Sequence, residues 1–241
     1  MATDHIVKSY DEELSRLTGI ITQMGGMAEN QLATAIQAMV KRDSELAAHT
    51  IERDVQVDNL EREVDNFVVR LLALRQPVAT DLRTIVTALR IAADLERIAD
   101  YAANVAKRAI ALNQVQPVRT MHSIPRMGEV VQAMIKDTLD AYVARDVERA
   151  MAVWQRDEEV DEMYNSLFRE LLTYMMEDPR SITTCTHLLF IAKNIERIGD
   201  HATNIAELIH YQVNGTPIKA NRPKGDNTSF AVVQHAREGN A

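Results

Sequence analysis

The sequence predicts an all-α protein built from two tandem, pseudo-repeated three-helix bundles with six long antiparallel helices. Apolar residues recur at three- and four-residue intervals through most of the chain, as amphipathic helices require, and no alternating strand pattern of useful length occurs. Only eight glycines and six prolines interrupt the 241 residues. An internal repeat completes the prediction, because residues 89–106 and 189–206 are identical at ten of eighteen positions without a gap.

The first half predicts helices at residues 5–41, 44–75 and 80–112. In the first of these, the stretch QMGGMAEN indicates a kink or close packing. Asp43 stands where the second helix needs an N-cap, and Pro77 interrupts the turn that follows it. The apolar stripe of the second helix is Leu60, Val64, Phe67, Leu71 and Leu74. The apolar stripe of the third helix is Ile91, Leu95, Ile98, Ala102 and Val105.

The second half predicts the same order of helices, at residues 123–144, 146–176 and 181–213. The linker-like stretch NQVQPVRTMHSIP comes before them. Asp146 provides an N-cap and Pro179 a break, as Asp43 and Pro77 do in the first half. The apolar stripe of the last helix is Ile191, Ile195, Ile198, Ala202, Ile205 and Ile209.

The repeat also extends upstream, where residues 42–58 align with residues 145–161. Two such units, each with its own apolar stripes, predict a pair of three-helix bundles rather than a solenoid, which needs at least about three repeats. We therefore expect a first bundle at 1–115, a second at 116–213, and a mobile polar tail at 214–241.

Composition limits the compartment and the partners. The net charge of −8 argues against nucleic acid or an anionic membrane surface as a primary partner, and it is compatible with cation binding. Cys185 is the only cysteine, so a reducing compartment is expected. The first residues do not resemble a secretory signal, and no apolar run has the ~20 residues of a membrane-spanning helix. We expect a cytoplasmic protein that meets a membrane only through partners.

The repeated segment carries acids at a spacing that helices normally avoid. Glu96, Asp100 and Asn104 are four residues apart, and Glu196, Asp200 and Asn204 repeat the arrangement. Residues four apart lie on one face of a helix, about 6 Å apart along its axis. Counting 100° per residue places this ladder opposite the apolar stripe, so we expect it to face outward.

The preceding helix of each half has a pair of its own, Asp54 with Asp58 and Asp157 with Asp161. If the helices predicted at 44–75 and 80–112 fold back on each other at Pro77, Asp54 lies opposite Asp100 and Asp58 lies opposite Glu96. The same construction in the second half turns the chain beside Pro179. The predicted metal ligands are therefore Asp54, Asp58, Glu96, Asp100, Asp157, Asp161, Glu196 and Asp200.

A solvated charged face would explain one such pair, since a like-charge pair costs only a few tenths of a kcal/mol. Four pairs at matching heights instead favour a cation that bridges two helices. Oxygen ligands suit Mg²⁺, Ca²⁺, Mn²⁺ or iron better than a structural zinc site. Asn104 and Asn204, like Glu61 and Asp65, are candidates for residues that surround and orient the metal ligands. Glu61 and Asp65 continue the first stripe, either as further ligands or as solvated acids.

Two other functional classes are open at this point. A carboxylate-bridged di-iron oxidase would bury Glu-x-x-His motifs inside a bundle. His201 follows Asp200, but the other half has Tyr101 at that place, so we expect His201 to be an exposed, neutral surface residue. A purely structural helical adaptor would use its acids only for solubility. The sequence contains no phosphate loop, no nucleophile elbow and no plausible Cys–His pair, so we expect no enzyme activity.

The acidic pattern, together with MGGMAENQL, RQPVATDLR, ERIAD, LLTYMMEDPRSI and NIERIGD, closely resembles the PhoU family of bacterial phosphate-transport regulators. The resemblance covers about residues 5–213, and the family's Glu/Asp-x-x-x-Asp motifs fall on the eight acids named above. Ala99 departs from the glycine that is common at that motif position.

This resemblance implies two three-helix bundles with metal clusters on their surface. It also implies negative regulation of the phosphate starvation response, in which the protein links the ATPase subunit of a phosphate ABC transporter to a sensor histidine kinase and modulates phosphate uptake. A homodimer is expected. The bound metal ions would be divalent or trivalent, with iron, manganese, magnesium and zinc all open.

Overall fold

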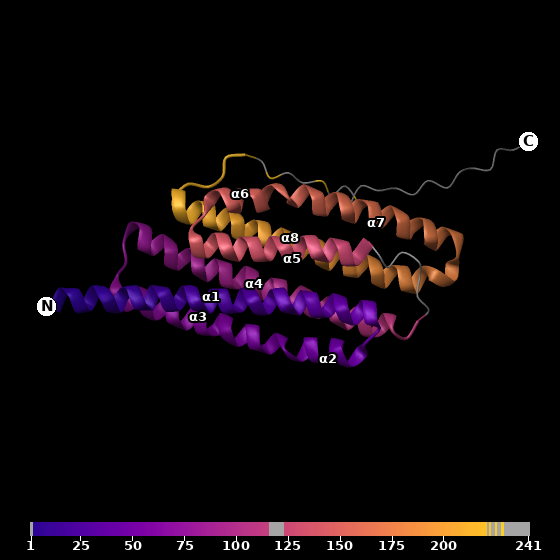
Figure 1. The fold of residues 1–241 in the computed structure, drawn as a ribbon, viewed down its shortest axis with the longest axis horizontal. Coiled ribbons are helices and arrows are strands. Elements are labelled where there is room, and N and C mark those ends of the chain that lie inside the picture. Colours follow the sequence, from indigo (N-terminus) through magenta and orange to yellow (C-terminus); the bar gives the residue numbers. More distant parts are fainter. Residues whose placement is uncertain (1, 116–122, 221, 223–224, 226–227, 229–241) are drawn as a thin grey trace, which may run out of the picture.

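The computed structural model describes residues 2–115, 123–220, 222, 225 and 228. Nine helical segments and no strand occur in this part of the chain, which confirms the all-α prediction. They are α1 (Ala2–Lys41), α2 (Ser44–Glu52), α3 (Asp54–Arg75), α4 (Ala79–Leu112), α5 (Ser123–Ala144), α6 (Val147–Gln155), α7 (Asp157–Glu177), the 3₁₀ helix η1 (Pro179–Ser181) and α8 (Ile182–Asn214) (Figure 1). None of these helices is both long enough and apolar enough to cross a membrane.

The predicted breaks between helices are confirmed. Asp43 Oδ1 accepts a hydrogen bond from the backbone N–H of Leu46 at 2.9 Å, and Asp146 Oδ1 accepts one from Arg149 N–H at 3.0 Å. These are the N-caps of α2 and α6. The α3–α4 hairpin reverses around Pro77, and the α7–α8 hairpin reverses through η1, which begins at Pro179.

The second and fifth predicted helices are each interrupted once, which the sequence analysis missed. Arg53 separates α2 from α3, and Arg156 separates α6 from α7. Neither place has a glycine or a proline, so no sequence signal marks the break. Each break lies directly before the first predicted metal ligand of its half. Asp54 and Asp157 therefore stand in the first turn of a helix, where the partial positive charge of free N–H groups favours a carboxylate.

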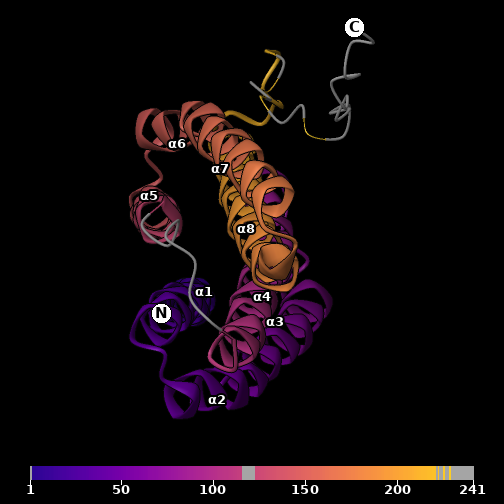
Figure 2. The same cartoon turned by 90° about the vertical axis from the view of Figure 1, so that its right-hand side faces the viewer.

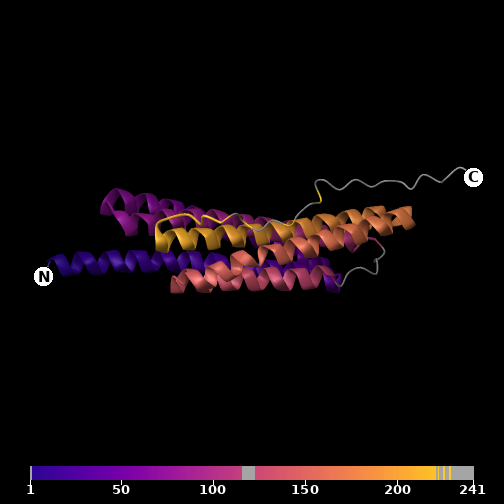
Figure 3. The same cartoon turned by 90° about the horizontal axis from the view of Figure 1, so that it is seen from above.

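The two halves pack side by side along their length. Viewed along the helices, α1 and α5 form one layer of the centre and α4 and α8 the other, with α2–α3 and α6–α7 on the outside (Figure 2). Seen from above, the helices lie nearly parallel to a common long axis (Figure 3). The buried apolar side chains form one cluster that includes Ile91 and Ile98 of α4 as well as Ile191 and Ile198 of α8.

Close packing between α1 and α5 depends on two glycines at repeat-related positions. A Cβ on Gly25 would lie 2.9 Å from Leu139 Cγ and nearer still to its methyl groups. A Cβ on Gly128 would overlap Ile36 Cδ1 in the same way. The stretch QMGGMAEN therefore marks a close helix crossing within a continuous α1, which is one of the two predicted alternatives.

Candidate functional site

The first acidic cluster consists of Asp54 and Asp58 on α3 with Glu96 and Asp100 on α4. Burial raises the pKa of Asp54, and the negative charges of Asp100 and Asp58 add to this effect, against a hydrogen bond from Gln31 Nε2 at 3.1 Å. Burial also raises the pKa of Glu96, with a further contribution from Asp100. The acids of the two helices therefore lie close enough to interact, as the predicted hairpin requires.

The first acidic cluster keeps an excess of negative charge. Arg97 Nε lies 3.5 Å from Glu96 Oε2 and Arg97 Nη1 lies 3.5 Å from Asp100 Oδ2, but the Arg97 side chain is 59% exposed. Long, solvated ion pairs of this kind contribute little. Glu61 adds to the repulsion. Burial raises its pKa, and the negative charges of Asp65 and Asp58 raise it further.

The second acidic cluster consists of Asp157 and Asp161 on α7 with Glu196 and Asp200 on α8. The predicted outward-facing ladder is wrong for Glu196, which is only 4% exposed, while Asp200 and Asn204 are half-buried. Their partners on α7 are buried too, since Asp157 is 2% and Asp161 4% exposed. The helices come close at Gly199, where a Cβ would lie 3.4 Å from Val160 Cγ1. Counting residues around one helix cannot show that a neighbouring helix covers the face in question.

The second acidic cluster is partly neutralised by two cations of the chain itself. Arg222 forms a two-pronged contact with Asp157, Nε to Oδ2 at 2.7 Å and Nη2 to Oδ1 at 2.8 Å, and its Nη2 also reaches Asp200 Oδ1 at 2.6 Å. Lys193 Nζ donates to Glu196 Oε1 at 2.8 Å. Burial alone would lower the pKa of Arg222, but its contacts with Asp157 and Asp200 outweigh this and raise it.

Three more contacts hold the C-terminal residues beside the second acidic cluster. The Gly225 N–H donates to Asp161 Oδ2 at 2.7 Å, and the Gly225 carbonyl accepts from Asn165 Nδ2 at 2.6 Å. Arg222 Nη1 also donates to Asn204 Oδ1 at 3.1 Å. Other parts of the predicted tail and linker, at 221, 223–224, 226–227, 229–241 and 116–122, lie outside the described residues.

Sequence reasoning missed the three residues that complete the second acidic cluster, Lys193, Arg222 and Gly225. Lys193 had a detectable signal, because it replaces Ala93 in the otherwise similar repeat. Arg222 and Gly225 had none, since they lie beyond the repeated region. Asn204 lies beside the second acidic cluster as predicted, whereas Asn104 accepts a hydrogen bond from Lys107 Nζ at 3.3 Å.

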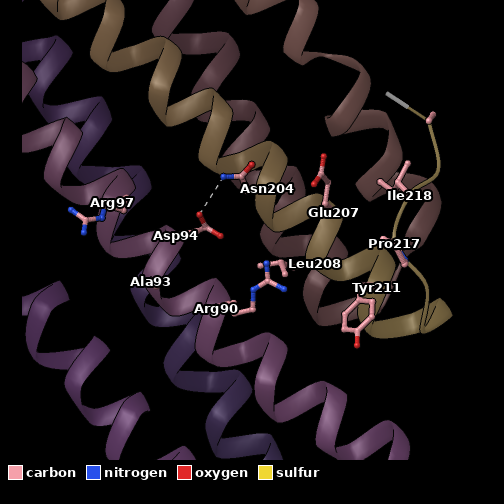
Figure 4. Close-up of a pocket in the computed structure, with 11 residues that line it drawn as sticks. Arg90, Ala93, Asp94, Arg97, Asn204, Glu207, Leu208, Tyr211, Pro217 and Ile218 are labelled. Carbon is pink, nitrogen blue, oxygen red and sulfur yellow. Dashed lines mark hydrogen bonds between the residues drawn. The ribbon is translucent and has the colours of Figure 1, made fainter. Parts of the chain in front are cut away.

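A groove of about 720 Å³ between α4 and α8 adjoins the second acidic cluster (Figure 4). Asp94 of α4 and Asn204 of α8 face each other across it, with Asn204 Nδ2 3.5 Å from Asp94 Oδ1. His201 Nδ1 lies 2.7 Å from the same Asp94 oxygen, and its side chain is 21% exposed. The prediction of an exposed surface histidine is therefore wrong, because His201 joins the two halves.

The Glu196 carboxyl lies in surroundings that disfavour its ionised form. Its Oε2 atom is buried and has no hydrogen-bond partner among the described residues. Burial raises the pKa of Glu196 to about 7, against the opposing contact with Lys193 and with a further increase from Asp200 and Asp161. A buried carboxylate oxygen without a partner is unfavourable unless a proton or a cation satisfies it.

In metal-free protein, Glu196→Gln is expected to raise the free energy of unfolding by about 3 kcal/mol at pH 8 and to change it little at pH 4.5. The folded-state pKa of about 7 lies above the ordinary 4.5, so the folded protein binds this proton more tightly than the unfolded chain. Ionisation therefore destabilises the fold as the pH rises from 4.5 through 7. Urea unfolding in chelator at both pH values measures the difference.

The exposed Glu170 provides the matched control, and Glu170→Gln should change stability little at either pH. Equal effects of the two variants at pH 8 would contradict the conclusion that ionised Glu196 destabilises the fold.

The donor atoms of both clusters suit a hard cation, since every candidate ligand is a carboxylate oxygen. In the second acidic cluster, one guanidinium nitrogen already lies within 2.8 Å of an Asp157 oxygen and 2.6 Å of an Asp200 oxygen, so two helices converge on one positive group. Within the described residues, no group of three His, Cys, Asp or Glu side chains could hold a metal ion as it stands. Side-chain rotation would have to bring further ligands in.

Comparison with known proteins identifies the family. The model of the PhoU domain matches the chain twice, at residues 21–109 and 124–209. The chain belongs to the PhoU family. Each match covers one half of the internal repeat, so both acidic clusters occur within PhoU domains, whereas Arg222 and Gly225 lie beyond the second match.

Several similar proteins extend over nearly the whole chain. A phosphate-specific transport system accessory protein PhoU homolog from Caulobacter vibrioides (strain NA1000 / CB15N) is 55% identical over 93% of this chain and 98% of its own length. The protein described in the same words from Rhizobium meliloti (strain 1021) is 49% identical, with 95% and 97% covered. The crystal structure of PhoU from Pseudomonas aeruginosa superposes with a TM-score of 0.84 at 42% identity, covering 86% of this chain and all of that one.

Proposed function

We propose that this protein is a cytoplasmic, metal-binding regulator of phosphate uptake that acts by binding partners rather than by catalysis. In this proposal it represses the phosphate starvation response by linking the ATPase subunit of a phosphate ABC transporter to a sensor histidine kinase. The observation that carries the proposal is the double PhoU-domain match, supported by relatives described as accessory proteins of the phosphate-specific transport system. A homodimer would present two copies of each acidic face.

Metal binding is part of the proposal for a physical reason. The first acidic cluster holds Asp54, Asp58, Glu96 and Asp100 together while burial and mutual repulsion raise the pKa of Asp54 and Glu96. A bound cation would supply the missing positive charge and make the face attractive to an acidic or polar partner surface. The ion would be divalent or trivalent, with iron, manganese, magnesium and zinc as candidates.

A phosphate-regulated reporter read in phosphate-rich medium tests the regulatory role. Deleting the gene is expected to leave the reporter expressed despite plentiful phosphate, while the wild type represses it. A variant with all eight cluster acids replaced by their amides should behave like the deletion at normal protein abundance, because both proposed metal faces are lost. Co-purification with the transporter ATPase subunit and the kinase should fall in parallel.

Two outcomes would count against the proposal in different ways. A deletion strain that still represses the reporter would remove the regulatory role. Normal repression by a stable eight-fold variant would keep that role but exclude the acidic faces as the surface that performs it.

A further inference from the structure

The C-terminal residues return along α8 and bring a cation to the second acidic cluster. Gly215 ends α8 with φ of 71°, a left-handed conformation that glycine adopts at little cost, and its N–H donates to Tyr211 O at 2.8 Å. Thr216 O lies 3.1 Å from His210 Nδ1, and Ile218 packs against the core. Pro217 and Ile218 line the groove beside α8 (Figure 4). We call Gly215–Ala220 with Arg222 and Gly225 the return segment.

We propose that Arg222 is a built-in counter-ion that competes with metal for the second acidic cluster, so that metal binds there only when the return segment is released. This inference rests on the proposed metal binding, and it assigns an autoinhibitory contact to residues beyond the PhoU-domain matches. The two acidic clusters would then differ in how readily they bind metal, although the repeat gives them the same four acids.

The geometry makes the two occupants mutually exclusive. Arg222 Nη2 lies between Asp157 Oδ1 and Asp200 Oδ1, at 2.8 and 2.6 Å. A cation that bridged α7 and α8 would use these oxygens at about 2.0–2.6 Å, which leaves no room for the guanidinium. The Gly225 N–H also occupies Asp161 Oδ2. The return segment thus donates hydrogen bonds to three of the four acids, Asp157, Asp161 and Asp200.

Arg222 is held as a specific contact rather than a loose surface pair. Its side chain is 16% exposed and that of Asp157 only 3%. The two-pronged geometry with Asp157 is the strong form of the arginine–carboxylate contact. Glu196 Oε2 remains buried without a partner among the described residues, which leaves one oxygen available to a cation that replaces Arg222.

The first acidic cluster has no counterpart of Arg222 among the described residues, and Ala93 stands where the second half has Lys193. Asp54 receives a hydrogen bond from the neutral amide of Gln31, whereas Asp157 receives two from the charged Arg222. The nearby Arg97 is largely exposed and makes only long contacts. Metal is therefore expected to enter the first acidic cluster at lower concentration than the second.

Mn²⁺ titration of the full chain, followed by electron paramagnetic resonance, tests the competition. The first acidic cluster is silenced with Asp54→Asn, Asp58→Asn, Glu96→Gln and Asp100→Asn, so that only the second is titrated. Adding Arg222→Met is expected to tighten Mn²⁺ binding about tenfold or more, the range of typical coupling between competing ligands. Lys219→Met is the matched control, because it removes one exposed charge from the same segment and should change the affinity little.

Limited trypsin digestion gives a second readout that does not depend on affinity. Because coupling is reciprocal, saturating Mn²⁺ should release the return segment and accelerate cleavage after Lys219 by a similar factor. In the Arg222→Met protein the cleavage should be fast with or without Mn²⁺. Mass spectrometry of the released peptide measures the rate.

The outcomes separate this inference from the proposed function. Equal Mn²⁺ affinity with and without Arg222 would overturn the competition while leaving metal binding intact. If Mn²⁺ fails to bind the second acidic cluster even in Arg222→Met, the inference falls. Titration of the unmodified first acidic cluster in the parent protein then shows whether the metal proposal falls with it.

Discussion

Metal bound at the first acidic cluster is expected to be lost when Asp54, Asp58, Glu96 and Asp100 are replaced by their amides. The affinity should fall at least about 100-fold, because removing direct ligands costs more than removing the groups that orient them. Helicity should persist, and stability in chelator should not decrease, because burial and mutual repulsion disfavour the ionised forms of Asp54 and Glu96. Mn²⁺ titration and circular dichroism measure the two effects.

The chain offers a control for the loss of four charges. Asp11, Glu12, Glu45 and Glu52 are exposed acids of the same half, and their amide variant should bind metal as the wild type does. The reciprocal variant in Asp157, Asp161, Glu196 and Asp200 should leave the first acidic cluster loaded, since each cluster lies within one half. Simultaneous loss of metal from both clusters in either variant would contradict separate sites.

Gly25→Leu is expected to lower the free energy of unfolding by about 3 kcal/mol. Even the first added carbon would overlap Leu139, which is 8% exposed and therefore has little room to move. The four added carbons would push α1 and α5 apart along the contact that joins the two halves. Urea unfolding measures the loss, and Leu139→Ala in the same chain should restore part of it by vacating the space.

Gly26→Leu is the matched control because Gly26 is exposed and a Cβ there meets no atom within 4 Å. Leucine is a better helix former than glycine, so this neighbour should be stabilised by about 0.5–1 kcal/mol. Equal destabilisation at Gly25 and Gly26 would indicate a general effect on α1 rather than the proposed packing contact.

Local rules determined the helices and their ends. Apolar spacing, the N-caps Asp43 and Asp146, and the turns at Pro77 and Pro179 act within a few residues, so the sequence predicts them directly. The one-residue breaks at Arg53 and Arg156 escaped prediction, because neither residue is a helix breaker and their backbones stay helical. The repeat also predicted which acids would face each other, because an antiparallel hairpin fixes their heights.

Burial of the second acidic cluster was decided only by the tertiary structure. Asp100 and Asp200 occupy the same place in the repeat, yet Asp100 contacts the exposed Arg97 of its own helix, whereas Asp200 contacts the half-buried Arg222, 22 residues further along the chain. The exposure of an acid depends on which helix or segment lies over it, and that contact is set by packing. The apolar periodicity of a single helix contains no information about which segment covers its acids.

The sequence by itself therefore determined an all-α repeat with two sets of facing acids and the membership in a family. The tertiary structure decided how the halves join, through the Gly25–Leu139 contact and the His201–Asp94 pair, and which cluster already holds an arginine of the chain itself. The physical reason is the range of the interactions. Helices and hairpins depend on residues close in sequence, whereas the charge balance of a buried site depends on whatever side chain the fold brings to it.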